Sequence, residues 1–375
     1  MVGRTAGPGA GRRVSMADVA ARAGVSGQTV SRVVNGSPRV DPATRLRVEA
    51  AMSELGYRPH RAARTLRTGR SQTIGLVVST LATVGNSRML QAVSDAAAAR
   101  GLALVVVTVG AGVEDGVAGA FERLEDQGVD GAIVLNEATP LARAVTPPAG
   151  LRLVVVDAPA WHRDASADGS RAGAAPGSGE TRGIDTVQTI DTVPMIDTVP
   201  MIDTVNTVQT DHAAGARIAT EHLISLGHTH IRHLAGPAGS FAAAERERGW
   251  RAALVAAGLE VVEPVRGAWT STAGYRAAAE IDDEATAVFC ANDQMALGIL
   301  RGLGERGVDV PGRVSVVGFD DVADARNYRP PLTTVRQDFD ALGEAAVAAL
   351  ADGAGGVAAV IPTRLIERKS TASPR

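Results

Sequence analysis

Hydrophobic and polar positions follow two different patterns along this chain, and the change falls near residue 73. Between residues 15 and 55 the apolar positions recur at helical spacing and predict three short helices. From residue 74 onward, apolar β-branched runs alternate with helical stretches. Such alternation predicts parallel sheets joined by right-handed crossovers. We therefore expect a small helical domain followed by a larger α/β domain.

Each of the first three helices is preceded by a residue that can cap it. Ser15 can cap the first helix, and Asp18 can complete a capping box with it. Ser26 and Asp41 can cap the second and third helices. Gly24, between the first two, can adopt the positive φ that a tight turn requires. These signals predict helices that begin just after residues 15, 26 and 41.

The second helix has one apolar and one polar side. Val30, Val33 and Val34 share a face that we place against the first helix, and the outward side is predicted to carry Gly27, Gln28, Ser31 and Arg32. For the third helix, the predicted apolar face consists of Leu46, Ala50, Met52 and Leu55.

Two helices joined by a glycine turn form a helix-turn-helix unit, which lays its second helix in the major groove. In that groove Gln28 can pair with adenine, and Arg32 with guanine or a phosphate. An ordinary helical hairpin with a solvated polar face has the same spacing, so spacing alone leaves both interpretations open.

The larger domain shows enough strands and helices for two sheets. The predicted strands are 74–79, 102–109, 131–136, 151–157, 231–236, 287–291 and 313–321, and the predicted helices are 89–101, 115–127, 212–227, 243–257, one starting near Thr272, and 292–307. We expect two lobes, each built on a parallel sheet, with a cleft between them. Ligands of such sheets bind outside the carboxyl ends of the strands.

An insertion at about 160–207 interrupts this alternation. Residues 164–183 are rich in Ala, Gly and Ser. The string IDTV then recurs at 184, 190, 196 and 202, a six-residue period. Four polar hexapeptides are too few to assert a β-helix, so a duplicated surface loop is the simpler interpretation.

Charge is distributed unevenly over the 375 residues. Residues 1–70 contain thirteen arginines and four acidic residues, which gives them a net charge of +9. Because the whole chain has a net charge of −3, residues 71–375 have a net charge of −12. A basic N-terminal region suggests a polyanionic partner, although a merely solvated basic surface has the same composition.

The single cysteine, Cys290, excludes an intramolecular disulfide and fits a reducing compartment. Residues 1–13 lack the apolar core of a signal peptide and are expected to form a disordered tail. No stretch reaches membrane-spanning length, so we expect a cytoplasmic, nucleoid-associated protein without a membrane partner.

Several strings carry a resemblance to a known family. SMADVAARAGVSGQTVSRVVN at 15–35, continued by NGSPRVDPATRLRVEAAMSELGYRP, resembles the helix-turn-helix of the LacI/GalR family of transcription regulators. HLAGPAGSFAAAERERGW, CANDQMALG, SVVGFDD and PPLTTVRQDF resemble the effector domain of its sugar-responsive members. The resemblance covers nearly everything outside residues 1–12 and the insertion.

This resemblance implies a domain order. A helix-turn-helix domain would span 14–58, a hinge helix and linker 59–70, and a two-lobed periplasmic-binding-protein-like domain 71–375. The hinge is too short for a stable isolated helix, so we expect it to fold on DNA. In the family, two such helices pair in the minor groove and a leucine wedges into the central base step. Leu66 occupies that position, and the alternative is an ordinary linker residue.

The resemblance also implies the contacts. Residues expected at DNA are Ser26, Gly27, Gln28, Thr29, Ser31, Arg32, Asn35, Arg39, Tyr57, His60, Arg64, Leu66 and Arg67. Residues expected at a sugar effector are Ser79, Asn136, Asp157, Arg246, Trp269, Asn292, Asp320, Gln337 and Phe339. The leucine-heptad tail of tetrameric members is absent, so the resemblance implies a homodimer on a pseudo-palindromic operator. Thr83, Thr210 and Gly27 depart from the family pattern, which puts the identity of the sugar and of the operator in doubt.

The residues themselves allow simpler roles. Carboxylates and amides at strand ends suit bonding to vicinal hydroxyls of a sugar. Asn292 could instead only cap a helix, Asp157 and Asp320 could be turn residues, and Arg246 could be a solvated helix charge. Trp269 and Phe339 could belong to the core rather than stack on a sugar.

The function we expect is a sugar-responsive repressor, with a β-galactoside as the first candidate effector. A sugar-binding transport protein of the same fold would have no use for residues 15–67. An α/β enzyme is disfavoured because GxSxG, P-loop and HExxH strings are absent. We therefore expect no catalytic residues, no metal and no cofactor. Other family members respond to other sugars, phosphosugars or purines, and this alternative stays open.

Overall fold

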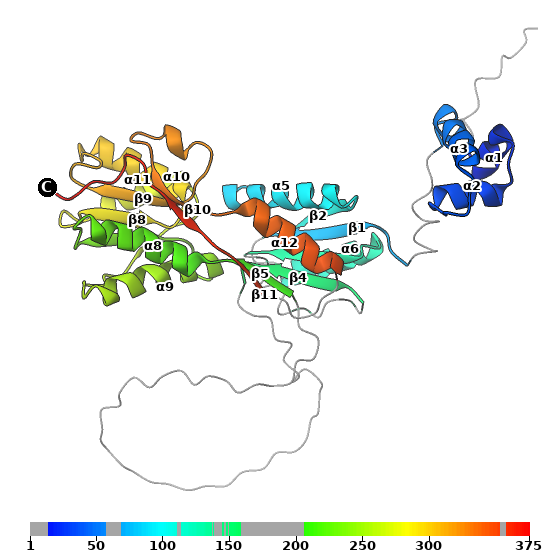
Figure 1. The fold of residues 1–375 in the computed structure, drawn as a ribbon. Coiled ribbons are helices and arrows are strands. Elements are labelled where there is room, and N and C mark those ends of the chain that lie inside the picture. The colour runs from blue at the N-terminus through cyan, green and yellow to red at the C-terminus, as the bar shows by residue number, and fades with distance from the viewer. Residues whose placement is uncertain are drawn as a thin grey trace, which may run out of the picture. The chain divides into compact units, whose positions relative to one another are not determined.

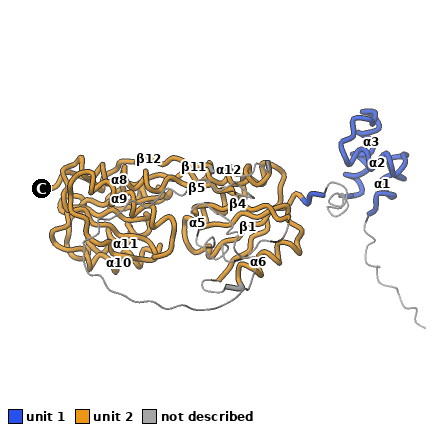
Figure 2. The backbone as a smooth tube through the Cα atoms, turned by 90° about the horizontal axis from the view of Figure 1, so that it is seen from below, with its two compact units in different colours: residues 1–71 blue, residues 72–375 orange. Residues whose placement is uncertain are grey.

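The structure is a computed structural model that describes residues 14–57, 69–110, 114–136, 150–158, 206–352 and 358–375, with single positions at 138, 145 and 148. It divides into two compact units, residues 1–71 and 72–375, shown in blue and orange in Figure 2. We describe each unit separately. No helix within the described ranges is long and apolar enough to cross a membrane.

The described part of the first unit contains helices α1 (Met16–Ala23), α2 (Gly27–Val34) and α3 (Pro42–Glu54). The predicted caps are confirmed: Ser15, Ser26 and Asp41 each accept a hydrogen bond from the backbone three residues on. Gly24 adopts φ 65°, as the turn requires. The core of this unit includes Val19, Val30, Val33, Val48 and Tyr57.

The predicted apolar face of α3 was partly wrong. Leu46 is 66% exposed and Ala50 is also exposed, whereas Val48 and Ala51 are buried. Met52 and Leu55 are half-buried, as part of the predicted face. The helix is rich in alanine and charge and has little amphipathic contrast of its own. Its buried side is therefore set by the docking of α1 and α2, which a local pattern does not record.

The first lobe of the second unit is built on a parallel sheet that has six strands within the described residues. Their order is β11-β5-β4-β3-β1-β2, and Figure 1 labels β1, β2, β4, β5 and β11. The strands are β1 (Thr73–Val78), β2 (Ala103–Thr108), β3 (Gly131–Leu135), β4 (Arg152–Val156), β5 (Asn206–Thr210) and β11 (Ala358–Ile361). Helices α5 (Val84–Ala99) and α12 (Phe339–Asp352) cover one face, and α6 (Glu114–Asp126) covers the other.

The second lobe has a sheet of the order β12-β10-β9-β8-β6-β7 within the described residues. Its strands are β6 (Ile231–Ala235), β7 (Val265–Arg266), β8 (Ala287–Cys290), β9 (Ser315–Asp320), β10 (Thr333–Arg336) and β12 (Arg364–Ile366). Helices α8 (His212–Ser225) and α9 (Phe241–Ala256) cover one face, and α10 (Ser271–Ala277) and α11 (Asp293–Glu305) the other. Short 3-10 helices span Ala278–Glu280 and Ala325–Asn327.

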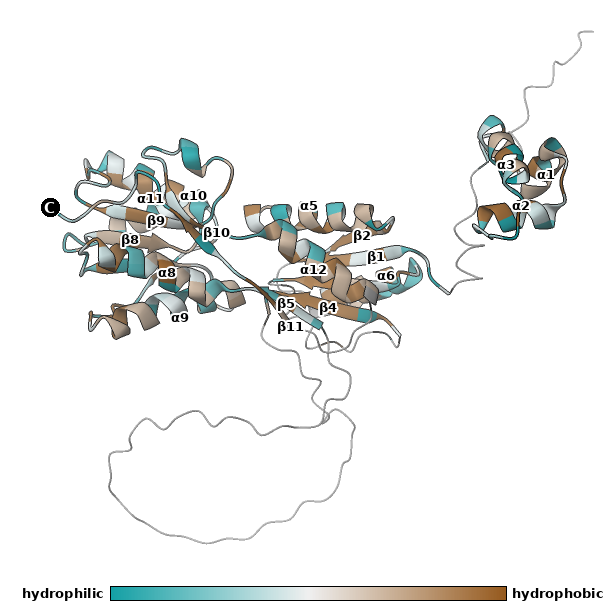
Figure 3. Ribbon diagram, viewed as in Figure 1, coloured by the Kyte–Doolittle hydropathy of each residue, from teal (hydrophilic) through white to brown (hydrophobic). Residues whose placement is uncertain are grey.

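Burial explains why the strands were recognisable in the sequence. Figure 3 shows β4 largely brown, whereas α8 carries brown and teal residues together. Strands covered by helices on both faces must be apolar on both sides, so they appear as continuous hydrophobic runs.

The described chain passes between the two lobes at β5–α8, β10–α12 and β11–β12. The first and last of these crossovers are bonded together. The amide of Asp211 donates to the carbonyl of Ile361 at 2.9 Å, and the hydroxyl of Thr363 donates to the carbonyl of Asp211 at 3.3 Å. The lobes are thus joined by adjacent strands rather than by a single linker.

Two sequence predictions about this unit need correction. The second sheet is not purely parallel, because β12 pairs antiparallel with β10. Helix α5 begins at Val84 rather than at residue 89, because Thr83 caps it and accepts from the backbone of Asn86. The sequence pattern also did not predict α12 or the strands β5, β7, β10, β11 and β12. Of these, α12 and β11 return to the first lobe after the chain has passed through the second.

Candidate functional site

Helix α2 presents a polar side outside the core of the first unit. Its first turn is fixed by Ser26, whose Oγ accepts from the backbone of Thr29 at 3.1 Å. Val30 is fully buried, whereas Gln28 and Arg32 are exposed. The exposed side chains therefore extend from a helix that is both capped and packed, which is what base recognition in a groove requires.

The remaining residues predicted at DNA differ in exposure. Gly27 and Arg39 are exposed, and Thr29 and Ser31 are half-buried. Asn35 ends α2, where its amide donates to the hydroxyl of Ser31 at 3.3 Å. Tyr57 is only 7% exposed and packs in the core of this unit. His60, Arg64, Leu66 and Arg67 lie outside the described residues, so their roles stay predictions.

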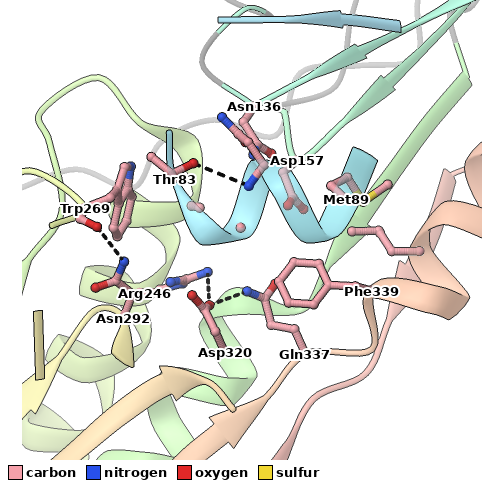
Figure 4. Close-up of a pocket in the computed structure, with 14 residues that line it drawn as sticks. Thr83, Met89, Asn136, Asp157, Arg246, Trp269, Asn292, Asp320, Gln337 and Phe339 are labelled. Atoms are coloured by element: carbon pink, nitrogen blue, oxygen red, sulfur yellow. Dashed lines mark hydrogen bonds and ion pairs between the residues drawn. The ribbon is translucent and has the colours of Figure 1, made fainter. Parts of the chain in front are cut away.

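A pocket lies between the two lobes of the second unit (Figure 4). Of the nine residues predicted at the effector, eight line it: Asn136, Asp157, Arg246, Trp269, Asn292, Asp320, Gln337 and Phe339. Ser79, which directly follows β1, does not. The pocket wall beside β1 is formed instead by the first turn of α5, at Thr83, Gly85 and Asn86.

Backbone geometry at strand ends places the polar side chains of this pocket. Asn136 and Asp157 follow β3 and β4, and Asp320 ends β9. All three have positive φ, at 43°, 51° and 115°. Asn and Asp tolerate this left-handed region better than other non-glycine residues, and such strained positions concentrate at functional sites. Asp157 and Asp320 are thus turn residues and pocket residues at once.

Arg246 is the cation of the pocket wall and only 4% exposed, so the alternative of a solvated helix charge was wrong. Its Nη2 lies 3.5 Å from Oδ1 of Asp320, and its Nη1 donates to the carbonyl of Ala291. The guanidinium lies 3.9 Å from the ring centroid of Phe319 and 5.5 Å from that of Trp269. Stacking and bonding together fix the plane of its donors.

His212 is a pocket-side residue that sequence reasoning missed. It begins α8 and is 1% exposed. Its Nδ1 accepts from Nε of Arg246 at 3.4 Å, which leaves the proton on Nε2, 3.1 Å from Oδ1 of Asp157. The histidine thereby connects a carboxylate of the first lobe with the guanidinium of the second. Its neighbours in the fold come from other elements, so no local motif marks it.

The groups around Asp157 lower the pKa of its carboxyl group. Burial raises the pKa of this carboxyl, but His212, the hydrogen bond from the amide of Thr210 at 2.8 Å and Arg246 lower it by more. The net pKa lies below its ordinary value, so Asp157 is a carboxylate near neutral pH. Thr210 contacts Asp157 through its backbone and does not line the pocket.

Asn292 both caps a helix and lines the pocket. Its Oδ1 caps α11 by accepting from the backbone of Met295 at 2.8 Å, while its Nδ2 donates to the carbonyl of Trp269 at 3.3 Å. It also lines the pocket. Cap and pocket wall coincide because α11 begins at the carboxyl end of β8.

Asp293, directly behind this pocket wall, should make stability depend on pH. Burial and the charge of Asp320 raise its pKa well above the ordinary value, and hydrogen bonds from Thr334 and Val322 offset this only in part. A carboxyl group whose pKa is raised in the folded state contributes fully to stability below its unfolded-state pKa of about 4. That contribution is lost as the pH rises through the folded-state pKa. We expect the free energy of unfolding of the wild type, measured in urea titrations, to fall relative to that of Asp293→Asn as the pH rises above about 4.

Asp321→Asn is the control, because the pKa of Asp321 is shifted in the opposite direction from that of Asp293. Despite burial, Arg368 and Arg336 lower the pKa of Asp321, so its contribution is present above about pH 4 and is lost in acid. Equal pH dependence of the two variants and the wild type would contradict this account.

Within the described ranges, no group of three or more His, Cys, Asp or Glu side chains is placed to hold a metal ion. The polar groups of the pocket are instead bonded to one another and to the backbone, and they come from both lobes. The arrangement is suited to hydrogen bonding a small ligand.

Comparison with known proteins agrees with this description. The profile described as bacterial regulatory proteins, lacI family, matches residues 15–60, and that of the periplasmic binding protein-like domain matches 220–371. The lactose operon repressor of Escherichia coli (strain K12) is 34% identical over 371 residues, covering 96% of this chain and 91% of that protein.

Two solved structures are similar along nearly the whole chain. The lac repressor dimer bound to operator and the anti-inducer ONPF has a TM-score of 0.75 at 31% identity, covering 96% of this chain and all of that one. The complex of the regulator CelR with cellobiose has a TM-score of 0.61 at 33% identity with the same coverage.

The fold and its two sites define a DNA-binding regulator that carries a ligand-binding domain of the periplasmic-binding-protein type. More specifically, the chain belongs to the lacI family of bacterial regulatory proteins.

Proposed function

We propose that this protein is a transcriptional repressor whose operator affinity is controlled by a small neutral sugar, with a β-galactoside as the first candidate. The observation that carries the proposal is the pocket itself. Carboxylates, amides and one stacked guanidinium from both lobes surround a space that Trp269 and Phe339 also line. Paired polar groups beside aromatic rings suit the hydroxyls and the apolar face of a sugar ring.

Control would work through the lobes. A sugar that bonds Asp157 in the first lobe and Arg246 in the second binds better to one arrangement of the lobes and shifts the population toward it. In a dimer on a pseudo-palindromic operator, this shift would alter the spacing of the two DNA-binding units. The affinities for sugar and DNA must then be coupled reciprocally.

The chemistry of the pocket supports a neutral sugar over a phosphosugar. Asp157 and Asp320 line the pocket, and Arg246, the cation among its lining residues, is already paired with Asp320. A phosphate would therefore enter a negatively charged site and lack a cation of its own. The CelR–cellobiose complex makes β-glucosides the second class of sugar to test.

The experiment is a gel-shift on the DNA upstream of the protein's own gene, with and without a panel of sugars. Lactose, methyl β-D-galactopyranoside, cellobiose and ribose form the panel, with ribose 5-phosphate as the anionic comparison. We expect a neutral disaccharide or galactoside to change operator affinity at constant salt. Operator binding that none of these compounds alters would contradict the proposed control, and no binding to duplex DNA even at low ionic strength would contradict the repressor itself.

Replacement of Gln28 by alanine should relax base preference at one position of each operator half-site. Gln28 is exposed on the first turn of α2, and a lost bidentate pair costs about 1–3 kcal/mol of discrimination. Affinity for unrelated duplex DNA should change little. The measurement is binding to a set of operators with single base changes, and Ser53→Ala, an exposed change on α3, is the control. Uniform weakening on every sequence would assign Gln28 to the phosphates instead.

A further inference from the structure

The amide of Asn86 has only one orientation compatible with its neighbours. Asn86 lies in the first turn of α5 and is 1% exposed. Its Nδ2 donates to the carbonyl of Thr80 at 2.9 Å. A carbonyl can only accept, so the nitrogen must face Thr80 and Oδ1 must face the other way. There Oδ1 accepts from Nδ2 of Asn136 at 2.5 Å.

Asn136 is oriented in turn by Asn86. With its nitrogen committed to Asn86, its Oδ1 is left as a buried acceptor that has no hydrogen-bond partner among the residues that the structure describes. Asn136 lies at the end of β3 with φ 43° and lines the pocket. A buried acceptor without a partner is costly, and a ligand that donates to it removes the cost.

The side-chain amide of Gln337, on the opposite side of the pocket, is also held in one orientation. Nε2 of Gln337 donates to Oδ1 of Asp320 at 2.6 Å, and a carboxylate can only accept. Oε1 of Gln337 is therefore, after Oδ1 of Asn136, a second acceptor among the residues lining the pocket that is buried without a hydrogen-bond partner in the described part of the chain. Figure 4 shows Asn136 above the pocket and Gln337 and Asp320 below it. Each amide nitrogen donates one hydrogen bond that fixes the orientation of its side chain, and each carbonyl oxygen is left available.

We propose that Asn86 is a specificity-determining residue that acts by positioning Asn136. It fixes the carbonyl oxygen of Asn136 as the group that meets the effector, so the effector must donate a hydrogen bond there. A hydroxyl satisfies this requirement, whereas fluorine, a methoxy group or a phosphate oxygen at the same place does not. The inference rests on the proposed sugar-binding function and adds which chemical groups the sugar must present.

A purely structural role for Asn86 would leave this selectivity unchanged. The cap of α5 uses Oγ1 of Thr83 and the backbone nitrogen of Asn86, which any side chain retains. Replacing Asn86 by alanine therefore keeps the cap and removes only the amide that orients Asn136. Without it, the Asn136 amide can rotate by half a turn and offer its Nδ2 to an acceptor.

The test compares a hydroxyl donor with its fluorine replacement. Calorimetry measures the affinity of the wild type for methyl β-D-galactopyranoside and its monofluoro and monodeoxy analogues, or for the matching cellobiose series if that sugar binds. We expect one position at which fluorine weakens binding roughly 10- to 100-fold, because the buried acceptor loses its donor. In Asn86→Ala this ratio should fall to about 3 or less, since Asn136 can then donate to fluorine.

Three further variants keep the inference falsifiable. Asn86→Asp retains an acceptor for Nδ2 of Asn136 and should retain the wild-type ratio. Asn136→Ala removes the acceptor and should lose the ratio while Asn86 is intact. Ser87→Ala, an exposed neighbour on α5, should behave as the wild type.

A ratio that survives in Asn86→Ala, or that is lost equally in Asn86→Asp, would overturn the inference while the proposed function stands. A wild type that binds none of these sugars would overturn the proposed function and this inference with it.

Discussion

Arg246→Lys should weaken sugar binding by at least about 100-fold while the protein stays folded. The arginine donates to the carbonyl of Ala291, pairs with Asp320 at 3.5 Å and stacks 3.9 Å from the ring of Phe319. A lysine ammonium preserves the charge but loses the planar fork of donors and the stacking. Calorimetric titration with the sugar that binds the wild type is the measurement.

Arg246→Met should have a larger effect, on the fold itself. It would leave Asp320 buried without its cation, in a place where burial already raises the pKa of that carboxyl. Removing one partner of a buried pair costs about 3–5 kcal/mol of unfolding free energy. Arg248→Met is the matched control, because Arg248 lies on the same helix with a 65% exposed side chain and pairs only with Glu245. Equal melting temperatures for the two variants would refute a structural role for Arg246.

Gly298→Ala should destabilise the second lobe by about 3 kcal/mol. Gly298 lies in α11 where this helix packs on α10. A Cβ built on it would overlap the carbonyl oxygen of Ser271 and the backbone nitrogen of Tyr275. Both obstacles are backbone atoms, so relief requires the two helices to move apart.

Gly304→Ala on the same helix is the matched control. A Cβ there meets nothing within 4 Å, and the residue is exposed. Alanine is the better helix former, so this change should stabilise by about 0.5–1 kcal/mol. Urea unfolding of both variants measures the difference, and a loss of the same size in each would show that helix propensity, not the close approach, sets the cost.

Local chemistry was enough to predict the three helices of the first unit and many elements of the second, but not always their buried sides. Capping by Ser15, Ser26 and Asp41 is encoded within four residues of sequence, so it could be read directly. Which side of α3 is buried depends on distant helices, and the expectation for Leu46 was accordingly wrong. Helix α5 was predicted to begin five residues too late because its first turn, VGNS, is polar in part and shows no apolar period.

In the pocket, too, some residues could be predicted from the sequence and others could not. Asn136, Asp157 and Asp320 stand at strand ends, where topology brings polar residues to one edge. The strand-end pattern and the family resemblance both indicated Asp157 and Asp320, whereas the resemblance alone indicated Asn136. His212 and Asn86 act through partners 34 to 55 residues away, and their own neighbourhoods in sequence carry no sign of it. Ser79 was expected at the pocket by position alone, but the first turn of α5 takes that place.

The adjacent crossovers have a consequence for synthesis of the protein. The first sheet takes its edge strand β11 and one of its covering helices, α12, from the last forty residues of the chain. While the ribosome is still translating the second lobe, the first lobe therefore lacks parts of its own core, including Leu342, Ala346 and Leu350. Neither lobe can be excised as a contiguous fragment, and the first lobe reaches its native state only after most of the second lobe has been translated.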